Sequence, residues 1–151
     1  MKITKTYIRD GRAPIPKKEI TSKIMSAIKA TNTKPELLLR KALWASGLRG
    51  YRLHWKKVPG RPDIAFPGKR IAIFVNGCFW HRCPNCKPAM PKSNLAFWEE
   101  KFNKNIHRDR LKIKSLKKLG WLTVVIWECQ LKKNLLLYVN RINALVINKT
   151  D

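Results

Sequence analysis

Acidic side chains are scarce in this chain. Of its 151 residues only 9 are Asp or Glu, against 33 Lys and Arg, and the formal net charge is +24. So large an imbalance destabilises a compact state through self-repulsion, which argues against a basic surface that serves solubility alone. A polyanion is the expected partner, and nucleic acid is the commonest polyanion.

Long apolar runs are also missing. No stretch approaches the roughly 20 residues of a membrane span, and the N-terminus lacks the apolar core of a secretion signal. We therefore expect no membrane partner and a cytoplasmic location. Four cysteines in a chain without an export signal indicate reduced thiols, and their clustering favours a metal site over disulfides.

The basic residues run the whole length, and the chain shows no internal repeat. Residues 1–20 combine Lys, Arg and two prolines with little periodicity, which predicts a flexible basic arm. Such an arm either contacts phosphates or is simply a disordered terminus. Residues 21–151 are long enough to bury a core and are predicted to form a single domain.

Helical and strand patterns alternate along that domain. Helices are expected from Thr21 or Ser22 to Ala30, from Thr33 to near Gly47, and over residues 95–119 and 134–147. Strands are expected over residues 51–55, 64–66, 70–75 and 121–127, and the third is apolar enough to be buried on both faces. This order predicts an α/β fold with a mixed sheet sandwiched by helices. The tryptophans of these elements are assigned to the core: Trp44, Trp55, Trp121 and Trp127.

Three of the four cysteines lie within the segment 76–86, directly after a predicted strand. Cys78, Cys83 and Cys86 have gaps of four and two residues, close to the spacing with which a loop wraps a tetrahedral ion. Cys129 follows the strand 121–127 and joins them if the two strands are neighbours. We predict a structural Zn²⁺ site of four thiolates, with no open coordination position. Unligated thiols and disulfides are the alternatives, and His81 either replaces one thiol or remains free.

Several motifs run in one order from about Ser22 to Leu131. They are Gly60-Arg61-Pro62-Asp63, Gly77-Cys78-Phe79-Trp80-His81, Phe97-Trp98, Asn105-Ile106-His107-Arg108-Asp109-Arg110 and Trp127-Glu128-Cys129. Together they resemble the very-short-patch repair endonucleases, bacterial mismatch nickases related in fold to type II restriction enzymes. The resemblance implies a restriction-endonuclease-like sheet and nicking on the 5′ side of the thymine in a T·G mismatch. Deamination of 5-methylcytosine makes that mismatch, and such a protein is nucleoid-associated when bound to DNA.

The resemblance also implies roles for single residues. Asp63 matches a metal-binding aspartate, and the backbone carbonyl of Val75 matches a second ligand. His81 matches a catalytic histidine and Glu36 a helix glutamate that assists catalysis. The four cysteines fall on or near the structural zinc ligands of the family. The residues matched to aromatics that wedge into the base stack beside the mismatch are Phe79, Trp80 and Trp98.

Three departures from the family pattern stand out. Restriction-enzyme relatives usually place an acidic residue and a lysine on the second strand of the hairpin, where this chain has Ile73-Phe74-Val75. Asn76 stands where some family members have histidine. The zinc loop of the family often mixes Cys and His, whereas Cys83 and Cys86 stand here.

The chemistry of these residues suits phosphodiester cleavage, which needs a nucleophilic water, charge neutralisation at phosphorus and a proton for the leaving oxygen. Mg²⁺ held by Asp63 supplies the first two, and histidine, here His81, exchanges protons near neutral pH. Position and spacing alone favour plainer roles. Asp63 then reads as a turn residue, and Glu36 as half of a capping box with Thr33, with Pro35 in the first helical turn.

Aromatic and basic residues beside each other favour contact with nucleic acid. Phe79 and Trp80 are adjacent, so we expect them to point different ways and at least one to be exposed. Unstacking costs least at a mismatch, so insertion selects weakly paired sites. On the long helix, Arg108 and Arg110 are expected to reach phosphates. Asn105 and Asp109 share a face at a spacing of four and are expected to bond each other or the site.

The leading hypothesis is a monomeric, Mg²⁺-dependent, strand-specific endonuclease acting on double-stranded DNA with a T·G mismatch. A zinc-stapled nucleic-acid-binding module without catalysis is the first alternative, motivated by the charge and the missing second carboxylate. A restriction or homing nuclease that cuts both strands is the second, and a homodimer would favour it.

Overall fold

A computed structural model describes residue 27 and residues 30–149. Its elements are α2 (Lys34–Ala45), β1 (Arg52–Leu53), β2 (Ile64–Phe66), the 3₁₀ turn η1 (Pro67–Lys69), β3 (Ile71–Asn76), α3 (Leu95–Lys118), β4 (Leu122–Trp127) and α4 (Glu128–Asn148). The basic arm expected over residues 1–20, and all but residues 27 and 30 of the first expected helix, lie outside the described residues. Among the described helices, none combines the length and apolar character that a bilayer crossing requires.

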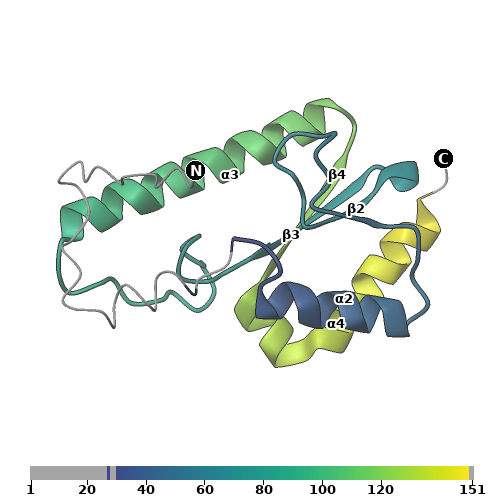
Figure 1. The fold of residues 1–151 in the computed structure, drawn as a ribbon, viewed down its shortest axis with the longest axis horizontal. Coiled ribbons are helices and arrows are strands. Elements are labelled where there is room, and N and C mark those ends of the chain that lie inside the picture. The colour runs from purple at the N-terminus through teal and green to yellow at the C-terminus, as the bar shows by residue number, and fades with distance from the viewer. Residues whose placement is uncertain (1–26, 28–29, 150–151) are drawn as a thin grey trace, which may run out of the picture.

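The four strands form one mixed sheet in the order β1-β2-β3-β4. β2 pairs antiparallel with β1 and with β3, whereas β3 pairs parallel with β4, from Ile71 opposite Leu122 to Asn76 opposite Trp127. Figure 1 shows α2 and α4 together on one side of the sheet and α3 on the other, with part of α3 extending past the sheet. The predicted α/β fold with a helix-covered mixed sheet is confirmed for the described residues.

β3 is the centre of this arrangement because it is buried on both faces. Ile71, Ile73 and Val75 pack in the cluster formed with α2 and α4. Ala72 and Phe74 pack on the opposite face with Leu116 of α3. Side chains of a strand alternate between faces, so an apolar run without polar interruption fits a strand with a helix layer on each side. The end of β3 therefore holds a fixed position, and the segment after it starts from a rigid base.

The start of α2 differs from the expected capping box. Thr33 makes no side-chain cap; instead its hydroxyl donates to Glu36 Oε1 at 2.9 Å. Glu36 Oε2 accepts the backbone N–H of Asn32 at 3.0 Å. The reason is burial, since Glu36 is only 3% exposed. Leaving a buried carboxylate without hydrogen-bond donors costs more free energy than leaving a helix N–H without its side-chain acceptor.

α4 follows β4 without a loop and has an internal break at Asn134 (φ −155°, ψ 80°). The Asn134 Oδ1 accepts the N–H of Leu137 at 3.1 Å, so Asn134 starts the second part of the helix as an N-cap does. The predicted helix from residue 134 is therefore found. The unpredicted part, residues 128–133, is the segment that carries Cys129.

Two local predictions were wrong. The strand expected over residues 51–55 is reduced to Arg52–Leu53, because His54 adopts a positive φ of 45°. Trp44 is 58% exposed, and Arg49 lies over its ring at 3.5 Å. The other three tryptophans are partly buried, and Trp55 and Trp121 pack together with their ring centroids 5.5 Å apart.

Candidate active site and metal centre

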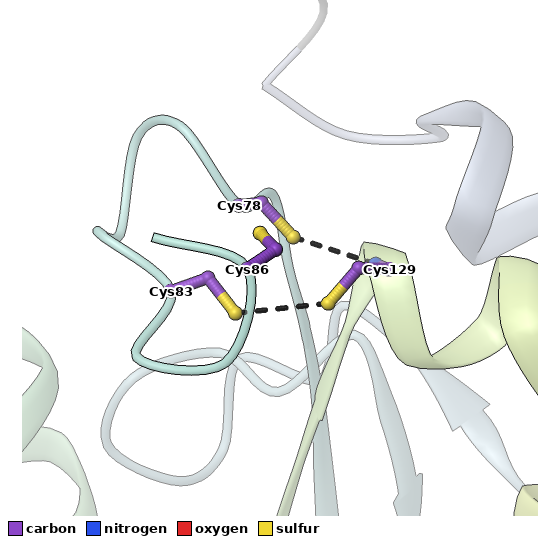
Figure 2. Close-up of side chains that lie close together, drawn as sticks. All are labelled: Cys78, Cys83, Cys86 and Cys129. Atoms are coloured by element: carbon purple, nitrogen blue, oxygen red, sulfur yellow. Dashed lines mark hydrogen bonds between the residues drawn. The ribbon is translucent and has the colours of Figure 1, made fainter. Parts of the chain in front are cut away.

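Four thiols from two distant parts of the chain meet beyond the paired ends of β3 and β4 (Figure 2). Cys78, Cys83 and Cys86 come from the loop after β3, and Cys129 comes from the start of α4. All four sulfurs lie within 4.8 Å of one another, and no disulfide joins them. The Sγ atoms of Cys83 and Cys129 are 3.7 Å apart, and the Cys129 N–H donates to Cys78 Sγ at 3.4 Å. The convergence expected from neighbouring strands is confirmed.

This donor set fits a tetrahedral metal ion. Sulfurs at about 2.3 Å from a central zinc are separated by about 3.8 Å in a tetrahedron, close to the Cys83–Cys129 distance. Burial and the neighbouring thiols of Cys78 and Cys83 raise the pKa of Cys129 to about 12. Four thiols in one place therefore resist ionising together, and a bound cation removes that obstacle because it is coordinated by the thiolate form.

The loop that carries three thiols also fixes His81. Its turns are closed by backbone hydrogen bonds, from His81 N–H to Gly77 O at 3.2 Å and from Cys83 N–H to Cys78 O at 2.9 Å. The His81 ring pairs through Nδ1 with Asp109 Oδ2 on α3. Asn105, one turn earlier on α3, donates to the backbone carbonyl of Trp80 at 3.0 Å. Of the two expected arrangements for Asn105 and Asp109, the structure shows the one in which both bond the loop of the site.

The second acidic group lies on the other side of the β3 end. Asp63 directly precedes β2, and its Oδ2 accepts the N–H of Val75 at 2.7 Å. Glu36 and His54 offer further donor atoms, all within 4.8 Å of one another and of Asp63. Carboxylate oxygens are the ligands that Mg²⁺ prefers, so Asp63 is suited to hold a hard cation. Val75 contacts Asp63 through its N–H, and the metal-ligand role expected of its carbonyl stays a prediction.

The pKa of Asp63 is raised to about 6. Burial is the main cause, and the charge of Glu36 adds to it, while the Val75 N–H, Arg40 and Lys112 act in the opposite sense. Burial would also raise the pKa of Asp109, but the hydrogen bond and charge of His81 and the charge of Lys112 outweigh it, so that pKa is lowered. The two aspartates thus differ in their affinity for a proton because only one has a close cationic partner.

Lys112 of α3 acts on both acidic groups through its charge. Its Nζ is 3.4 Å from Asp109 Oδ1, and its charge also acts on Asp63. The aliphatic stem fills the space at Gly60, where an added Cβ would come within 2.8 Å of Lys112 Cγ. Gly60 also has a φ of +81°, which disfavours any side chain. The glycine of the Gly60-Arg61-Pro62-Asp63 motif therefore makes room for this ammonium.

Lys112→Met is expected to raise the pKa of Asp63 further above about 6, because a positive charge that acts on the carboxylate is lost. A titration of the Asp63 carboxyl carbon by NMR measures this. Lys114→Met, at an exposed position of the same helix, is the matched control and should leave the titration unchanged. An unshifted midpoint in the Lys112 variant would contradict the assigned charge interaction.

Aromatic rings gather where the loop meets the first turns of α3. Phe79 lies 5.1 Å from Trp80, 5.7 Å from Trp98 and 5.2 Å from Phe102, measured between ring centroids. Phe79 and Trp80 are both half-buried in this one cluster, so the prediction that they point different ways was wrong. Edge-to-face packing of the adjacent rings makes this possible. The Lys101 Nζ lies 5.2 Å from the Trp80 ring, which places positive charge beside the rings.

Two arginines expected to reach phosphates, Arg108 and Arg110, are exposed on α3. Arg108 donates to Asn105 Oδ1 at 2.6 Å. Because Asn105 donates to the Trp80 carbonyl, two hydrogen bonds connect that carbonyl to the surface of α3. Residues two apart do not share a helix face, so Arg108 and Arg110 present their charges in different directions.

Sequence reasoning missed three residues of these groups: Arg40, His54 and Lys112. His54 reaches Asp63 through the register of β1 and β2, since its N–H donates to Asp63 O at 3.2 Å in continuation of their pairing. The sequence does not determine that register, because β1 is only two residues long. Arg40 follows Glu36 by four residues, the spacing of a helical ion pair. Nothing in the sequence distinguishes Lys112 from the other lysines of α3.

Comparison with known proteins yields a consistent set of relatives. A family model described as DNA mismatch endonuclease Vsr matches residues 14–87. The chain is 42% identical over 108 residues to the type II nicking enzyme V.XorIIP of Xanthomonas oryzae pv. oryzae, which covers 72% of this chain and 79% of that relative. It is 42% identical over 123 residues to the type II nicking enzyme V.NmeAIP of Neisseria meningitidis, covering 82% and 86% respectively. It is 38% identical over 120 residues to the DNA mismatch endonuclease Vsr of Escherichia coli, covering 80% and 76%.

Proposed function

The chain belongs to the Vsr family of DNA mismatch endonucleases, and from this premise we propose that it nicks one strand of duplex DNA on the 5′ side of the thymine in a T·G mismatch. The observation that carries the proposal is that the ammonium of Lys112, which pairs with Asp109 of the His81–Asp109 pair, also acts through its charge on Asp63, which bonds the end of β3. The net charge of +24 suits a DNA partner. We further propose a restriction-endonuclease-like fold and a monomer acting on the genomic DNA of the cytoplasm.

Asp63 is the proposed ligand of a catalytic Mg²⁺, with the Val75 carbonyl as a second ligand. When bound, the ion supplies charge neutralisation at the scissile phosphate and promotes formation of the nucleophile. His81 accepts or returns the proton of the reacting water, and Asp109 holds its ring in place and stabilises the charged form. Lys112 adds a positive charge next to the phosphate position. Glu36 contributes through Arg40, to which it is hydrogen-bonded at 3.1 Å.

The four cysteines are proposed to hold a structural Zn²⁺. A site closed by four thiolates has no position for substrate, so its role is to fix the loop from Gly77 to Lys87. That loop carries His81, Phe79 and Trp80, and the ion is thereby the support of the catalytic group and of the aromatic cluster. Phe79, Trp80 and Trp98 are the proposed wedge beside the mismatch, with Asn105, Arg108 and Arg110 as DNA contacts.

The test is cleavage of end-labelled duplexes that differ in one base pair. A T·G duplex, the matched T·A and C·G duplexes and a C·A duplex are incubated with Mg²⁺ and analysed on a denaturing gel, with each strand labelled in turn. A single cut in the thymine strand, only with T·G, is the expected result. Cuts in both strands of matched DNA would favour a restriction-type nuclease. Tight, salt-sensitive binding without any product would favour a non-catalytic DNA-binding module.

Asp109→Asn is expected to reduce the single-turnover nicking rate by about 10²- to 10⁴-fold, the range of a general acid–base contribution. The neutral amide no longer stabilises a protonated His81, while the side-chain volume and the fold are kept. His81→Ala should lose a similar factor, and the double variant should lose little more, because residues acting as one unit are not additive.

Glu99→Gln serves as the control for that series, since it removes one negative charge from an exposed position of the same helix. It should nick at the wild-type rate. Fully additive losses in the Asp109 and His81 variants would contradict the assignment of the two residues as one functional pair.

A further inference from the structure

The side chains of Arg40, His54 and Asp63 lie next to one another in that order. Arg40 of α2 has its Nη2 at 2.8 Å from the Nε2 of His54, which follows β1. The other ring nitrogen of His54, Nδ1, faces Asp63 Oδ1 at 3.8 Å. His54 therefore lies between a guanidinium and the aspartate that is proposed to bind the catalytic metal ion.

The first contact determines which nitrogen of His54 carries the proton. An arginine side chain has five N–H donors and no acceptor. For Arg40 to bond His54, the Nε2 atom must accept and must therefore lack a hydrogen. A neutral imidazole with an unprotonated Nε2 has its proton on Nδ1, the ring nitrogen that lies 3.8 Å from Asp63 Oδ1.

Arg40 is itself held in place by other contacts. Its Nη2 also donates to Glu36 Oε2 at 3.1 Å, and its Nη1 donates to Asn32 Oδ1 at 2.7 Å. The Arg40 side chain is only 12% exposed, and its Nε is buried without a hydrogen-bond partner. A buried donor left unpaired costs stability, so this arrangement is poorly explained by stability alone. A functional demand on the position of Arg40 accounts for that cost.

The alternative is that Glu36, His54 and Asp63 bind a metal ion together, since their donor atoms lie within 4.8 Å of one another. A histidine ligand needs a free lone pair directed at the ion. In His54 the Nε2 lone pair is used by Arg40, and Nδ1 carries hydrogen. The guanidinium between Glu36 and His54 also repels a cation. Asp63 alone remains suited to ligation.

We propose that His54 is a positioning residue for Asp63: Arg40 fixes its Nδ1–H tautomer, and this N–H orients the carboxylate that ligates the metal ion. The inference rests on the proposed role of Asp63 as a metal ligand. At 3.8 Å the N–H acts on Oδ1 through its dipole, and a small shift of either side chain closes the contact to a hydrogen bond. With Val75 N–H on Oδ2, each carboxylate oxygen then has one protein donor and keeps a lone pair for the ion.

The first test needs no substitution. Nitrogen-15 NMR of the full chain, loaded with zinc and free of Mg²⁺, distinguishes the two neutral tautomers of His54 by the shifts of their ring nitrogens. A protonated Nδ1 and an unprotonated Nε2 are expected, and Arg40→Met should abolish this preference. A protonated Nε2 in the wild-type chain overturns the proposal.

The second test measures metal affinity with Mn²⁺ as a paramagnetic probe of the Mg²⁺ site in DNA-free protein. His54→Leu should weaken Mn²⁺ binding by about 10- to 100-fold, the usual effect of removing a residue that orients a ligand. His54→Asn places an amide N–H near the position of Nδ1 and should recover most of the affinity. Wild-type affinity in His54→Leu, or an imidazole nitrogen coupling to Mn²⁺ that this variant loses, overturns the positioning role.

Asp63→Asn separates this inference from the function on which it rests. If Asp63→Asn loses Mn²⁺ binding and His54→Leu keeps it, only the positioning role of His54 fails. If Asp63→Asn also binds Mn²⁺ like the wild type, the proposed metal site itself fails, and the role of His54 fails with it. Zinc content and thermal unfolding, measured on every variant, show that the fold is retained.

Discussion

Asp63→Asn is expected to abolish Mg²⁺-dependent nicking and, in the same molecule, to make the metal-free protein more stable at neutral pH. The activity is lost because an amide is a poor ligand for a hard cation that prefers carboxylates. Losing the ion removes several kcal/mol of charge stabilisation in the transition state, which corresponds to a rate loss of about 10³-fold or more. Single-turnover nicking of a T·G duplex measures this loss.

The gain in stability follows from the pKa of Asp63, raised from 3.8 to about 6 chiefly by burial. A carboxyl whose pKa is higher in the folded state binds its proton more tightly when folded. Folding is therefore opposed once that proton is lost, and the penalty appears as the pH rises from about 4 to about 6. A shift of this size corresponds to about 1 to 3 kcal/mol. Asparagine has no charge to bury, and its Oδ1 can still accept the Val75 N–H.

Urea unfolding of zinc-loaded, Mg²⁺-free protein at several pH values checks this prediction. Wild type and Asp63→Asn should have equal free energies of unfolding near pH 4 and diverge through pH 6, with the variant more stable above it. Glu99→Gln, which removes an exposed charge, should show no such divergence. A variant less stable than the wild type at pH 7.5 would show that the buried charge is compensated by contacts other than those described.

Cys83→Ser is expected to have the largest effect on stability. Cys83 is only 2% exposed, and a hydroxyl is a far weaker zinc ligand than a thiolate. Structural zinc binding stabilises small metal-bound segments by about 10 kcal/mol or more, of which a larger fold loses part. We expect bound zinc to fall from one per chain to none and the unfolding temperature to fall by about 10 °C or more. Metal analysis and calorimetry measure the two effects.

Nicking should fall together with zinc content although no catalytic group is changed, because the same loop holds His81 against Asp109. Cys86→His, made in the wild-type chain, is the matched control. Cys86 is the exposed thiol of the four, and three cysteines with one histidine are a common zinc ligand set. This variant should keep zinc and most of its stability. If Cys83→Ser binds one zinc per chain and unfolds like the wild type, the four-thiolate site is wrong.

The residues that sequence could place are those with a local pattern. The apolar run of β3 identified a strand buried on both faces, and two cysteine positions after strand ends identified the thiol cluster once the strands were neighbours. Trp44 could also have been placed, since Leu39 and Leu43 are fully buried at a spacing of four. The next residue lies about 100° around the helix from that buried face, on the exposed side.

The residues that sequence could not place depend on register between separate elements. His54 reaches Asp63 only because β1 and β2 pair with Leu53 opposite Ile64. β1 is too short for its partner strand to be predicted from the sequence. Lys112 packs at Gly60 and acts on Asp63 through its charge only because α3 passes the Gly60 turn at one helical position. Such contacts are determined by the packing of a helix layer on the sheet. The sequence of a helix with many charged residues does not show which of them faces the site.

The parallel pairing of β3 with β4 has a topological consequence. Cys78 and Cys129 are 51 residues apart in the chain, and α3 with all of β4 lies between them. An ion shared by these two thiolates closes that segment into a ring, as a cross-link would. Closing a loop of this length restricts the unfolded chain by about 4 kcal/mol in the chain-entropy model. Metal loading should therefore make the amide protons of α3 and β4 exchange together, as one cooperative unit that contains His81, Asp109 and Lys112.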